Sequence, residues 1–528
     1  MPVIGYVSDE RYLALPGAAV EISDGTRFWR TVSTASGAID VDCPPGTYRV
    51  TLARDGYGAK HVDAVIGGAP HQFRLTSDQL YGYVWPKWSR SGESAEFRVH
   101  SPAAYRLSMH RYGAGVQECG VVGWFDEHAP RATVQTTPDG DFTQTGVDWN
   151  SRGYVDPAMR QFVTAPERGG LYYFHAENEA GQFFSFPWVV APARPTARIA
   201  VLASTNTWNA YNNFGGRSNY INPVGLPDRP VLVPRQELRR YGDSSYAENA
   251  FPDDDYPPLS FERPEPLNQV LRGERPEDPV RGRQPCHLAS AEWRLLSWLE
   301  RNGYPYDLYA DAQLHDGTLD LDAYRVLVLN THPEYWSREM YAAVHSWVFE
   351  RGGRLMYLGG NGVDCEVEFV NDGTALHYLT QQGPGFFDKY ESRMHRTYRP
   401  TSELLGVVFT PAGAMTSAPY EVVDARHWAF AGTGLATGDV FGRFSLHERC
   451  PGGASGHETD KRTPHSPDGT TVIARGQNVD NGGAEIVHFA TPGGGEVFSA
   501  GSITWSTALP VDEAVGAVTA NVLDRFLG

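Results

Sequence analysis

The sequence has little cysteine, little basic charge and no long apolar run. Its five cysteines in 528 residues are scattered, odd in number and without CxxC spacing, so they predict neither a disulfide framework nor a zinc site. The net charge of −18 argues against nucleic acid or an anionic membrane as the main partner. No apolar run could span a bilayer, and the start MPVIGYVSDERY lacks the regions of a signal peptide. We therefore predict a soluble, cytoplasmic protein of a reducing compartment.

Length and composition predict several domains with substantial cores. The 528 residues suggest about three domains, and 41% hydrophobic residues exclude global disorder. Residues 1–76 and 79–193 alternate short apolar and polar runs with proline- and glycine-rich turns, which predicts two successive β-sandwiches. Residues 197–528 alternate buried-strand runs with helical patterns, which predicts an open, mostly parallel α/β sheet of the glutamine-amidotransferase or flavodoxin kind. An irregular insertion interrupts this sheet at about 222–288.

Helical periodicity predicts helices on both sides of this sheet. One amphipathic pattern covers 290–302, and a second begins at Ser337 and ends at the glycines 352 and 353. A last helix is expected with Pro510 in its first turn, because proline is favoured at the first helical position.

The stretch Arg325–Ser337, RVLVLNTHPEYWS, is where we expect a strand to end in functional residues. Its first half is an apolar β-branched run typical of a strand buried on both faces. Pro333 then restricts its own backbone and that of His332, so no helix can run through this point. A histidine and a glutamate two residues apart are thereby held at the carboxyl end of a buried strand, where α/β sheets bind ligands.

Three predicted strands end in unusual polar and aromatic loops. These loops are TNTWNAYNNFGGRSNY (205–220), NTHPEYWS (330–337) and GGNG (359–362). Parallel strands place their carboxyl ends on one edge of a sheet, so the three loops should converge there. Their glycines allow close backbone approach. We therefore expect one site at this edge.

The residue types in these loops indicate an oxygen-rich site. Neither GxGxxG nor GxxxxGK[ST] occurs, so phosphate is a poor candidate ligand. Tyr211, Tyr220 and Glu334, with His332 beside them, make a hard donor set that suits a highly charged ion such as ferric iron. Tyrosine must lose a proton to bind a metal, and buried tyrosines more often serve packing. Both interpretations stay open on the residues alone.

Two sets of motifs resemble known families. Residues 197–527 resemble the large, catalytic subunit of N,N-dimethylformamidase and its relatives through NTWNAYNNFGGRSNY, THPEYWS, GRLMYLGGNG, GASGHETD and VFSAGSITW, in this order. The leading segments LPGAAVEI and SGAIDVDCPPGTYRVTLARDGY resemble the carboxypeptidase-regulatory-like, transthyretin-like module.

The formamidase resemblance implies an amidohydrolase with one ferric iron, Fe(3+), per site. The family holds its iron with two tyrosines and one glutamate, and the motifs carry these roles to Tyr211 and Glu334. The second tyrosine falls on Tyr220, with Tyr246 and Tyr256 as alternatives nearby. Further family active-site positions fall on His332, Asn361 and Glu458.

The resemblance also implies a mechanism and partners. A metal-activated water would attack a small carboxamide or formamide; Glu458 or His332 would move the proton, and Asn361 would bind the oxyanion or orient the substrate. We expect the pocket to be lined by Trp208, Phe214 and Trp336. A homo-oligomer is expected, and the family's small partner subunit has no obvious counterpart segment here.

Two other classes of protein compete with this interpretation. Cys365 could be the nucleophile of an amidotransferase-like hydrolase, although GGNGVDCEV lacks a tight nucleophile elbow. Alternatively, the sandwiches and the aromatic-rich α/β region could form a non-catalytic protein that binds glycans or a partner chain.

Overall fold

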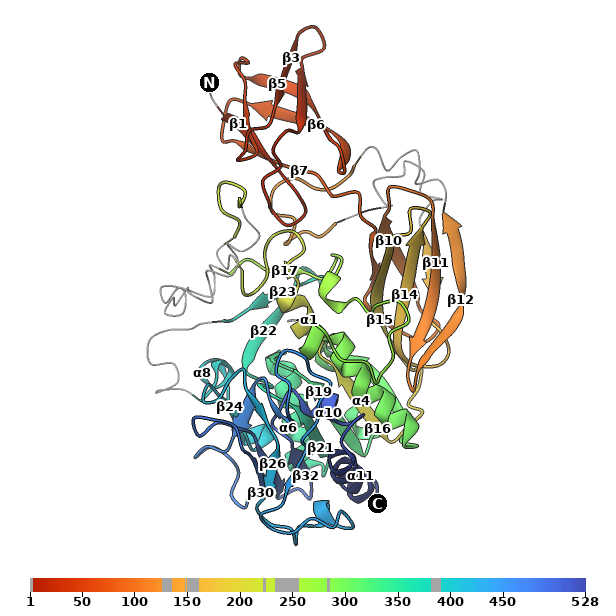
Figure 1. The fold of residues 1–528 in the computed structure, drawn as a ribbon, viewed down its shortest axis with the longest axis vertical. Helices are drawn as coiled ribbons and strands as arrows, with labels where there is room; N and C mark the ends of the chain where they lie inside the picture. Colours follow the sequence, from red (N-terminus) through yellow and green to blue (C-terminus); the bar gives the residue numbers. More distant parts are fainter. Residues whose placement is uncertain are drawn as a thin grey trace.

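A computed structural model describes residues 3–125, 135–147, 149, 161–221, 225–232, 256–282, 285–380 and 391–528. Within these residues the chain is rich in β-strands, arranged in several sheets, with few helices (Figure 1), which is consistent with the predicted β-sandwiches. No helix in the described ranges is long and apolar enough to cross a membrane.

The N-terminal strands form two sheets around one apolar core. The sheets have the orders β4-β1-β7 and β3-β2-β5-β6. Val7, Val50 and Phe73 are fully buried in the core. Alternating burial along β5 places every second side chain inside, as the sequence pattern predicts. The strands are β1 (Val3–Ser8), β2 (Ala19–Ser23), β3 (Phe28–Val32), β4 (Ala38–Asp40), β5 (Gly46–Arg54), β6 (Gly58–Ile66) and β7 (His71–Arg74).

The next strands form a second pair of sheets with a larger, aromatic core. Their orders are β13-β10-β8 and β12-β11-β14-β15-β9. The core contains Phe97, Phe174 and Trp188. The strands are β8 (Tyr81–Trp85), β9 (Trp88–Arg90), β10 (Ser94–His100), β11 (Tyr105–Tyr112), β12 (Val116–Phe125), β13 (Phe162–Thr164), β14 (Gly170–Asn178) and β15 (Phe183–Ala191).

A nine-stranded mixed sheet dominates the rest of the chain. Its order is β18-β16-β19-β21-β32-β31-β30-β26-β27. Pairing is parallel from β18 to β32 and antiparallel from β32 to β27, so the prediction of a mostly parallel sheet holds for one half only. The strands are β16 (Ile199–Ala203), β18 (Tyr306–Ala310), β19 (Val326–Thr331), β21 (Arg354–Gly359), β26 (Tyr420–Val422), β27 (Val440–Phe441), β30 (Thr471–Gly476), β31 (Glu485–Ala490) and β32 (Glu496–Ser499). The glutamine-amidotransferase or flavodoxin comparison stays a prediction.

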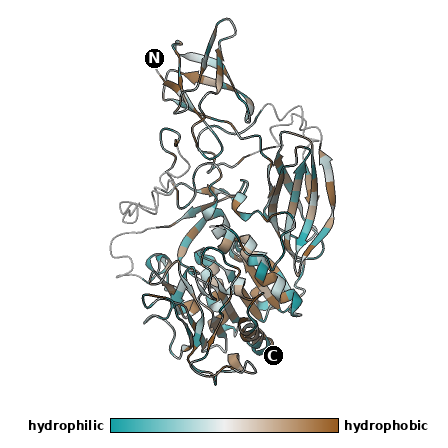
Figure 2. Cartoon of the chain, in the orientation of Figure 1, coloured by the Kyte–Doolittle hydropathy of each residue, from teal (hydrophilic) through white to brown (hydrophobic). Residues whose placement is uncertain are grey.

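Helices cover both faces of the parallel half of this sheet. Side chains alternate along β16: Val201 joins one hydrophobic cluster with α4 (Ala289–Arg301) and α11 (Glu513–Leu527), while Leu202 joins another with α6 (Arg338–Glu350). Brown, hydrophobic residues accordingly follow these strands and helices in Figure 2. A strand buried on both faces must be apolar at every position, which is why its sequence does not alternate.

The ends of two helices are set by capping side chains. The side chain of Ser337 accepts a hydrogen bond from the N–H of Met340 at the start of α6, as expected from the sequence. Asp512 caps α11 by accepting from the N–H of Val515. The prediction that Pro510 lies in the first turn of this helix is wrong, because the cap places the first helical residue at Glu513.

A smaller four-stranded sheet, β17-β23-β22-β20, follows the carboxyl ends of the parallel strands. In Figure 1 its β22 and β23 (teal) lie between the nine-stranded sheet and the N-terminal strands. Its strands are β17 (Leu259–Ser260), β20 (Tyr335–Trp336), β22 (Cys365–Val370) and β23 (Ala375–Tyr378). The remaining elements are α1 (Thr205–Tyr211), η4 (Pro266–Asn268), η5 (Pro285–His287), α5 (Asp311–His315), η6 (Leu321–Ala323), α8 (Arg393–Thr397), α9 (Thr401–Leu405), β24 (Val408–Thr410), β25 (Ser417–Ala418), η7 (Trp428–Phe430), β28 (Ser455–Gly456), β29 (Thr459–Lys461) and α10 (Trp505–Ala508).

Candidate functional site

Three adjacent parallel strands deliver the candidate site residues to one edge of the sheet, as predicted. Strand β16 leads into α1, which ends at Tyr211, and Tyr220 follows nine residues later. Strand β19 leads to His332 and Glu334, and β21 leads to Asn361. The first of the three predicted loops opens with the helix α1, which ends at Tyr211.

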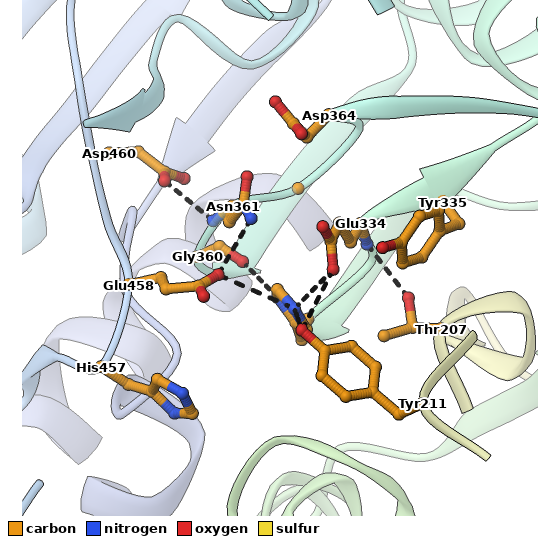
Figure 3. Close-up of polar contacts among 12 residues, drawn as sticks. Thr207, Tyr211, Glu334, Tyr335, Gly360, Asn361, Asp364, His457, Glu458 and Asp460 are labelled. Carbon is orange, nitrogen blue, oxygen red and sulfur yellow. Dashed lines mark hydrogen bonds and ion pairs between the residues drawn. The ribbon is translucent and has the colours of Figure 1, made fainter. Parts of the chain in front are cut away.

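Glu334 contacts several of the candidate side chains, and Figure 3 shows the phenol of Tyr211 pointing toward it. Its Oε2 accepts a hydrogen bond from the phenol of Tyr220 at 2.8 Å and lies 3.4 Å from the phenol oxygen of Tyr211. The same oxygen lies 3.0 Å from Nε2 of His332, whose Nε2 is also 3.8 Å from Oε2 of Glu458. We call Tyr211, Tyr220, His332, Glu334 and Glu458 the Glu334 cluster.

Backbone contacts hold His332 and Glu334 in these positions. Nδ1 of His332 lies 2.9 Å from the carbonyl oxygen of Gly360, so it donates there and leaves Nε2 facing the two carboxylates. The N–H of Glu334 donates to Oγ1 of Thr207 at 3.2 Å. Pro333 between them accepts from the N–H of Val363 through its carbonyl. The proline therefore helps to turn both side chains toward one point.

The pKa values of the buried pair His332 and Glu334 are shifted so that both side chains are charged. Burial alone would lower the pKa of His332, but the hydrogen bond and charge of Glu334 and the charge of Glu458 raise it to about 9. Burial would raise the pKa of Glu334, but the hydrogen bond and charge of His332 and the charge of Arg393 outweigh it and leave the pKa below its ordinary range. The pair is therefore an imidazolium beside a carboxylate at neutral pH.

In contrast to the pKa of Glu334, the pKa values of the two tyrosines and of Glu458 are raised. Burial, and then the charge of Glu334, raise the pKa of Tyr211 and of Tyr220 well above its usual range. Burial also raises the pKa of Glu458, although the charge of His332 opposes this. Tyr211, Tyr220 and Glu458 are only partly buried, so they form the accessible side of the cluster. Their oxygens take up protons unless a cation compensates their charge.

Asn361 joins the third strand to Glu458. Its Nδ2 donates to Oε2 of Glu458 at 2.9 Å, and its backbone N–H donates to Oδ1 of Asp460 at 2.8 Å. Asp460 also accepts from the phenol of Tyr357 at 2.7 Å, and burial raises the pKa of Asp460 to about 7. A Cβ at Gly360 would lie 2.4 Å from the carbonyl oxygen of Glu458, so only glycine allows this approach.

Four non-glycine residues around the cluster have a left-handed backbone. Thr331, Asn361, Val363 and His457 have φ values of 50°, 48°, 52° and 66°. Non-glycine residues rarely adopt this left-handed region, and for a β-branched side chain it is costly. Each of the four is next to a residue of the cluster or supports one, which is typical of functional sites.

Arg393 and His287 lie near the cluster but could not be identified as site residues from the sequence. Nη1 of Arg393 lies 3.8 Å from Oε1 of Glu334, and its Nε lies 3.2 Å from Asp364. The ring of His287 packs edge-on to that of Tyr211 with centroids 4.5 Å apart. Arg393 comes from a stretch without periodicity and His287 from the end of the insertion, so only folding brings them here.

The three aromatic residues expected to line the pocket are buried side chains, and the pocket itself stays a prediction. Trp208, Phe214 and Trp336 are each at most 3% exposed and pack in three different hydrophobic clusters. Tyr211 packs against the hydrophobic cluster that contains Trp208. Of the three candidates for the second tyrosine, Tyr220 donates a hydrogen bond to Glu334, Tyr256 is a buried side chain, and Tyr246 lies outside the described residues.

Cys365 does not have the properties of a nucleophile. It is fully buried in an apolar cluster with Tyr335 and Tyr378. Burial raises the pKa of its thiol well above the ordinary range, which keeps it protonated and unreactive. The cysteine-based alternative is therefore disfavoured by the structure.

The donor set of the Glu334 cluster fits a hard cation. Two phenols and two carboxylates bring oxygen donors together, with one imidazole beside them. Ferric iron prefers such oxygen donors, and its charge would offset the raised pKa values of the phenols. The residues that would hold the ion are Tyr211, Tyr220 and Glu334.

Comparison with known proteins decides the family. Residues 106–517 match the family model described as N,N-dimethylformamidase beta subunit-like, C-terminal, and this range is well over half of the 528 residues. The chain belongs to this family. The dimethylformamidase-like region begins in β11 and ends within α11, so it includes every residue of the Glu334 cluster but not the N-terminal strands β1–β10.

Individual relatives are distant. The chain is 27% identical to the N,N-dimethylformamidase beta subunit of Paracoccus aminophilus, over 86% of this chain and 68% of that protein. It is 24% identical to the corresponding subunit of an Alcaligenes species, over 72% of this chain and 58% of that protein. A solved structure of a thua-like protein from Bacteroides uniformis aligns with 46% of this chain and 87% of its own, at 14% identity and a TM-score of 0.26.

Proposed function

We propose that this protein is a metal-dependent amide hydrolase that cleaves the C–N bond of a small carboxamide or formamide. The observation that carries the proposal is the convergence of the Tyr211 and Tyr220 phenols on one oxygen of Glu334, with His332 and Glu458 alongside. Membership of the dimethylformamidase family supports an amide as the substrate. We propose one ferric ion per site, held by Tyr211, Tyr220 and Glu334.

When bound, the ion would polarise the amide carbonyl and make a water acidic enough to attack at neutral pH. The chain's own residues would then move protons. Glu458 is partly exposed and burial raises its pKa, so its carboxylate is suited to accept the proton of the attacking water. Asn361 orients that carboxylate by donating to its Oε2.

His332 is the group that would return a proton to the departing amine. Its Nε2 lies between Glu334 and Glu458, and Nδ1 is held by Gly360. A protonated imidazole at this place can donate when the C–N bond breaks, and Glu458 can then reprotonate it across 3.8 Å. Asn361 positions Glu458 through one N–H of its Nδ2, and the second N–H of this amide can donate to the oxyanion.

Assembly with other chains is part of the proposal. The relatives are named as beta subunits, and this chain spans 58% and 68% of the length of the two described above. We propose that the protein works as an oligomer, with a second, smaller chain as one candidate partner. The identity of the amide is left to assay.

The deciding experiment is metal analysis of the purified protein, combined with a visible spectrum and hydrolysis assays on dimethylformamide and other small amides. We expect about one iron per chain, a tyrosinate-to-iron charge-transfer band and release of amine. Iron-free protein that folds, shows no hydrolysis and binds a glycan or protein would support the non-catalytic alternative. Retained hydrolysis after complete iron removal would refute the metal-dependent mechanism.

A further inference from the structure

We propose that Glu391, His395 and His465 form a second metal site, for a divalent transition-metal ion such as Zn²⁺. A carboxylate oxygen and one nitrogen of each imidazole lie within 4.8 Å of one another. Glu391 lies two residues before α8 and His395 lies within it, whereas His465 lies in the loop after β29. Folding therefore brings a third donor from a distant segment to two that are four residues apart.

The donor types differ from those of the Glu334 cluster. Two imidazoles and one carboxylate are a ligand set of zinc sites, which leaves a fourth position for water. The His395 and His465 rings meet edge-on, with centroids 4.8 Å apart. Nitrogen donors of this kind favour Zn²⁺ over the hard Fe³⁺ ion.

Neighbouring groups orient the three side chains. The carboxylate of Glu391 accepts from the backbone N–H of Ser402 at 2.5 Å through Oε1, and from the hydroxyl of Thr463 at 3.1 Å through Oε2. The N–H of His465 donates to the same Thr463 hydroxyl at 3.2 Å. The N–H of His395 donates to the Ser392 hydroxyl that caps α8. Such outer hydrogen bonds hold metal ligands in place and strengthen binding.

The position of this cluster suggests what the ion would do. An ion bound there would tie α8 to the loop that carries Thr463 and His465. The same helix begins with Arg393, whose guanidinium lies 3.8 Å from Glu334. The second site would thus be structural and would steady a residue beside the Glu334 cluster. It shares no side chain with that cluster, so it stands or falls independently of the proposed iron site.

The test uses the full-length protein, washed with a chelator and titrated with Co²⁺ as a coloured substitute for Zn²⁺. We expect about one equivalent of Co²⁺ to bind and to give the visible absorption band of four-coordinate cobalt. Adding Zn²⁺ should displace the Co²⁺ and remove this band. The titration is repeated in Tyr211→Phe, where the band should persist because this substitution affects only the Glu334 cluster.

Three variants and one control test which side chains bind the Co²⁺ ion. His465→Ala, His395→Ala and Glu391→Gln should each weaken Co²⁺ binding by at least about tenfold, whereas His61→Ala, on the exposed side of β6, should not. Zn²⁺ should raise the melting temperature of the wild type but not that of His465→Ala, whose exposed side chain can be removed without disturbing a core. Absence of Co²⁺ binding, or binding that survives His465→Ala, would overturn the proposal. If His395→Ala fails to fold, the His465 result decides.

Discussion

The phenol of Tyr220 donates a 2.8 Å hydrogen bond to Oε2 of Glu334, although 114 residues separate the two in the sequence. That oxygen also lies 3.0 Å from Nε2 of His332 and 3.4 Å from the phenol oxygen of Tyr211. One carboxylate oxygen thus collects three possible proton donors, which is an arrangement suited to a cation once the donors have lost their protons.

Replacing Tyr220 by phenylalanine should remove a metal ligand while preserving the ring. We expect the iron content and the charge-transfer colour to be largely lost and hydrolysis to fall by at least about 100-fold, a larger effect than changes to groups around a ligand usually cause. Tyr309→Phe is a matched control, because its phenol pairs with Tyr324 at 2.7 Å away from the cluster. Equal iron content in both variants would argue against Tyr220 as a ligand.

Glu458→Gln separates proton transfer from metal binding. The substitution keeps the size of the side chain and a partner for Asn361 but removes the acid–base function. Iron and colour should be retained, and kcat should fall by about 10²- to 10⁴-fold. Glu448→Gln, on an exposed surface, is the control. A variant that still turns over within about threefold of the wild type would assign the proton transfer to another group.

Arg393→Met tests the cation that faces Glu334 from outside the cluster. The guanidinium is only 13% exposed and lies 3.8 Å from Glu334 and 3.2 Å from Asp364. Its loss leaves two buried carboxylates without this partner, so we expect the free energy of unfolding to fall by about 3–5 kcal/mol in urea titrations. Arg49→Met removes a pair with Asp63 in which the two side chains are 67% and 66% exposed, and should have a much smaller effect on the free energy of unfolding. Similar losses in the two variants would contradict this role for Arg393.

Glu292 should make stability depend on pH. Burial raises its pKa from an ordinary value of 4.5 to about 8, while its Oε1 accepts from the indole N–H of Trp208 at 2.8 Å. The folded state holds the Glu292 proton more tightly than the unfolded state does. The contribution of this proton to the stability of the fold is therefore complete below pH 4.5 and is lost as the pH rises to about 8.

Glu292→Gln should remove this pH dependence, because the amide stays neutral and keeps an acceptor for Trp208. At pH 8 the variant should be more stable than the wild type, by an amount on the order of 4 kcal/mol at most. Urea titrations at a series of pH values measure the difference, with the exposed Glu339→Gln as control. Parallel stability curves for wild type and Glu292→Gln would show that Glu292 does not titrate as described.

Gly360→Ala should disturb the site through the backbone alone. The added Cβ would lie 2.4 Å from the carbonyl oxygen of Glu458 and 2.7 Å from the backbone nitrogen of Ile503. Neither atom belongs to a flexible side chain, so we expect about 1–3 kcal/mol of destabilisation and reduced hydrolysis. Gly68→Ala meets nothing within 4 Å and should be neutral. Calorimetry and the amide assay of both variants check this; full activity in Gly360→Ala would show that the loop can shift.

Local pattern predicted the strands that carry the site but not all of what surrounds it. The apolar runs of β16, β19 and β21 were identifiable because strands buried on both faces admit few polar residues. The helix α1 was missed because its residues Thr205–Tyr211 are polar and aromatic without a clear apolar stripe, and tertiary packing buries most of them. Trp208, Phe214 and Trp336 enter three different hydrophobic clusters, because adjacency in sequence does not tell which core an aromatic side chain enters.

The sequence by itself determined that His332 and Glu334 follow a buried strand and that Pro333 separates them, because these features depend on local backbone preferences. The family resemblance named Tyr211, Tyr220, Asn361 and Glu458 as their companions. Only the tertiary structure decided that Tyr220 reaches the same oxygen of Glu334 as His332, and that Arg393 approaches the other oxygen. These contacts join segments distant in sequence, and their distances depend on the order of the strands and on side-chain packing, which no local pattern encodes.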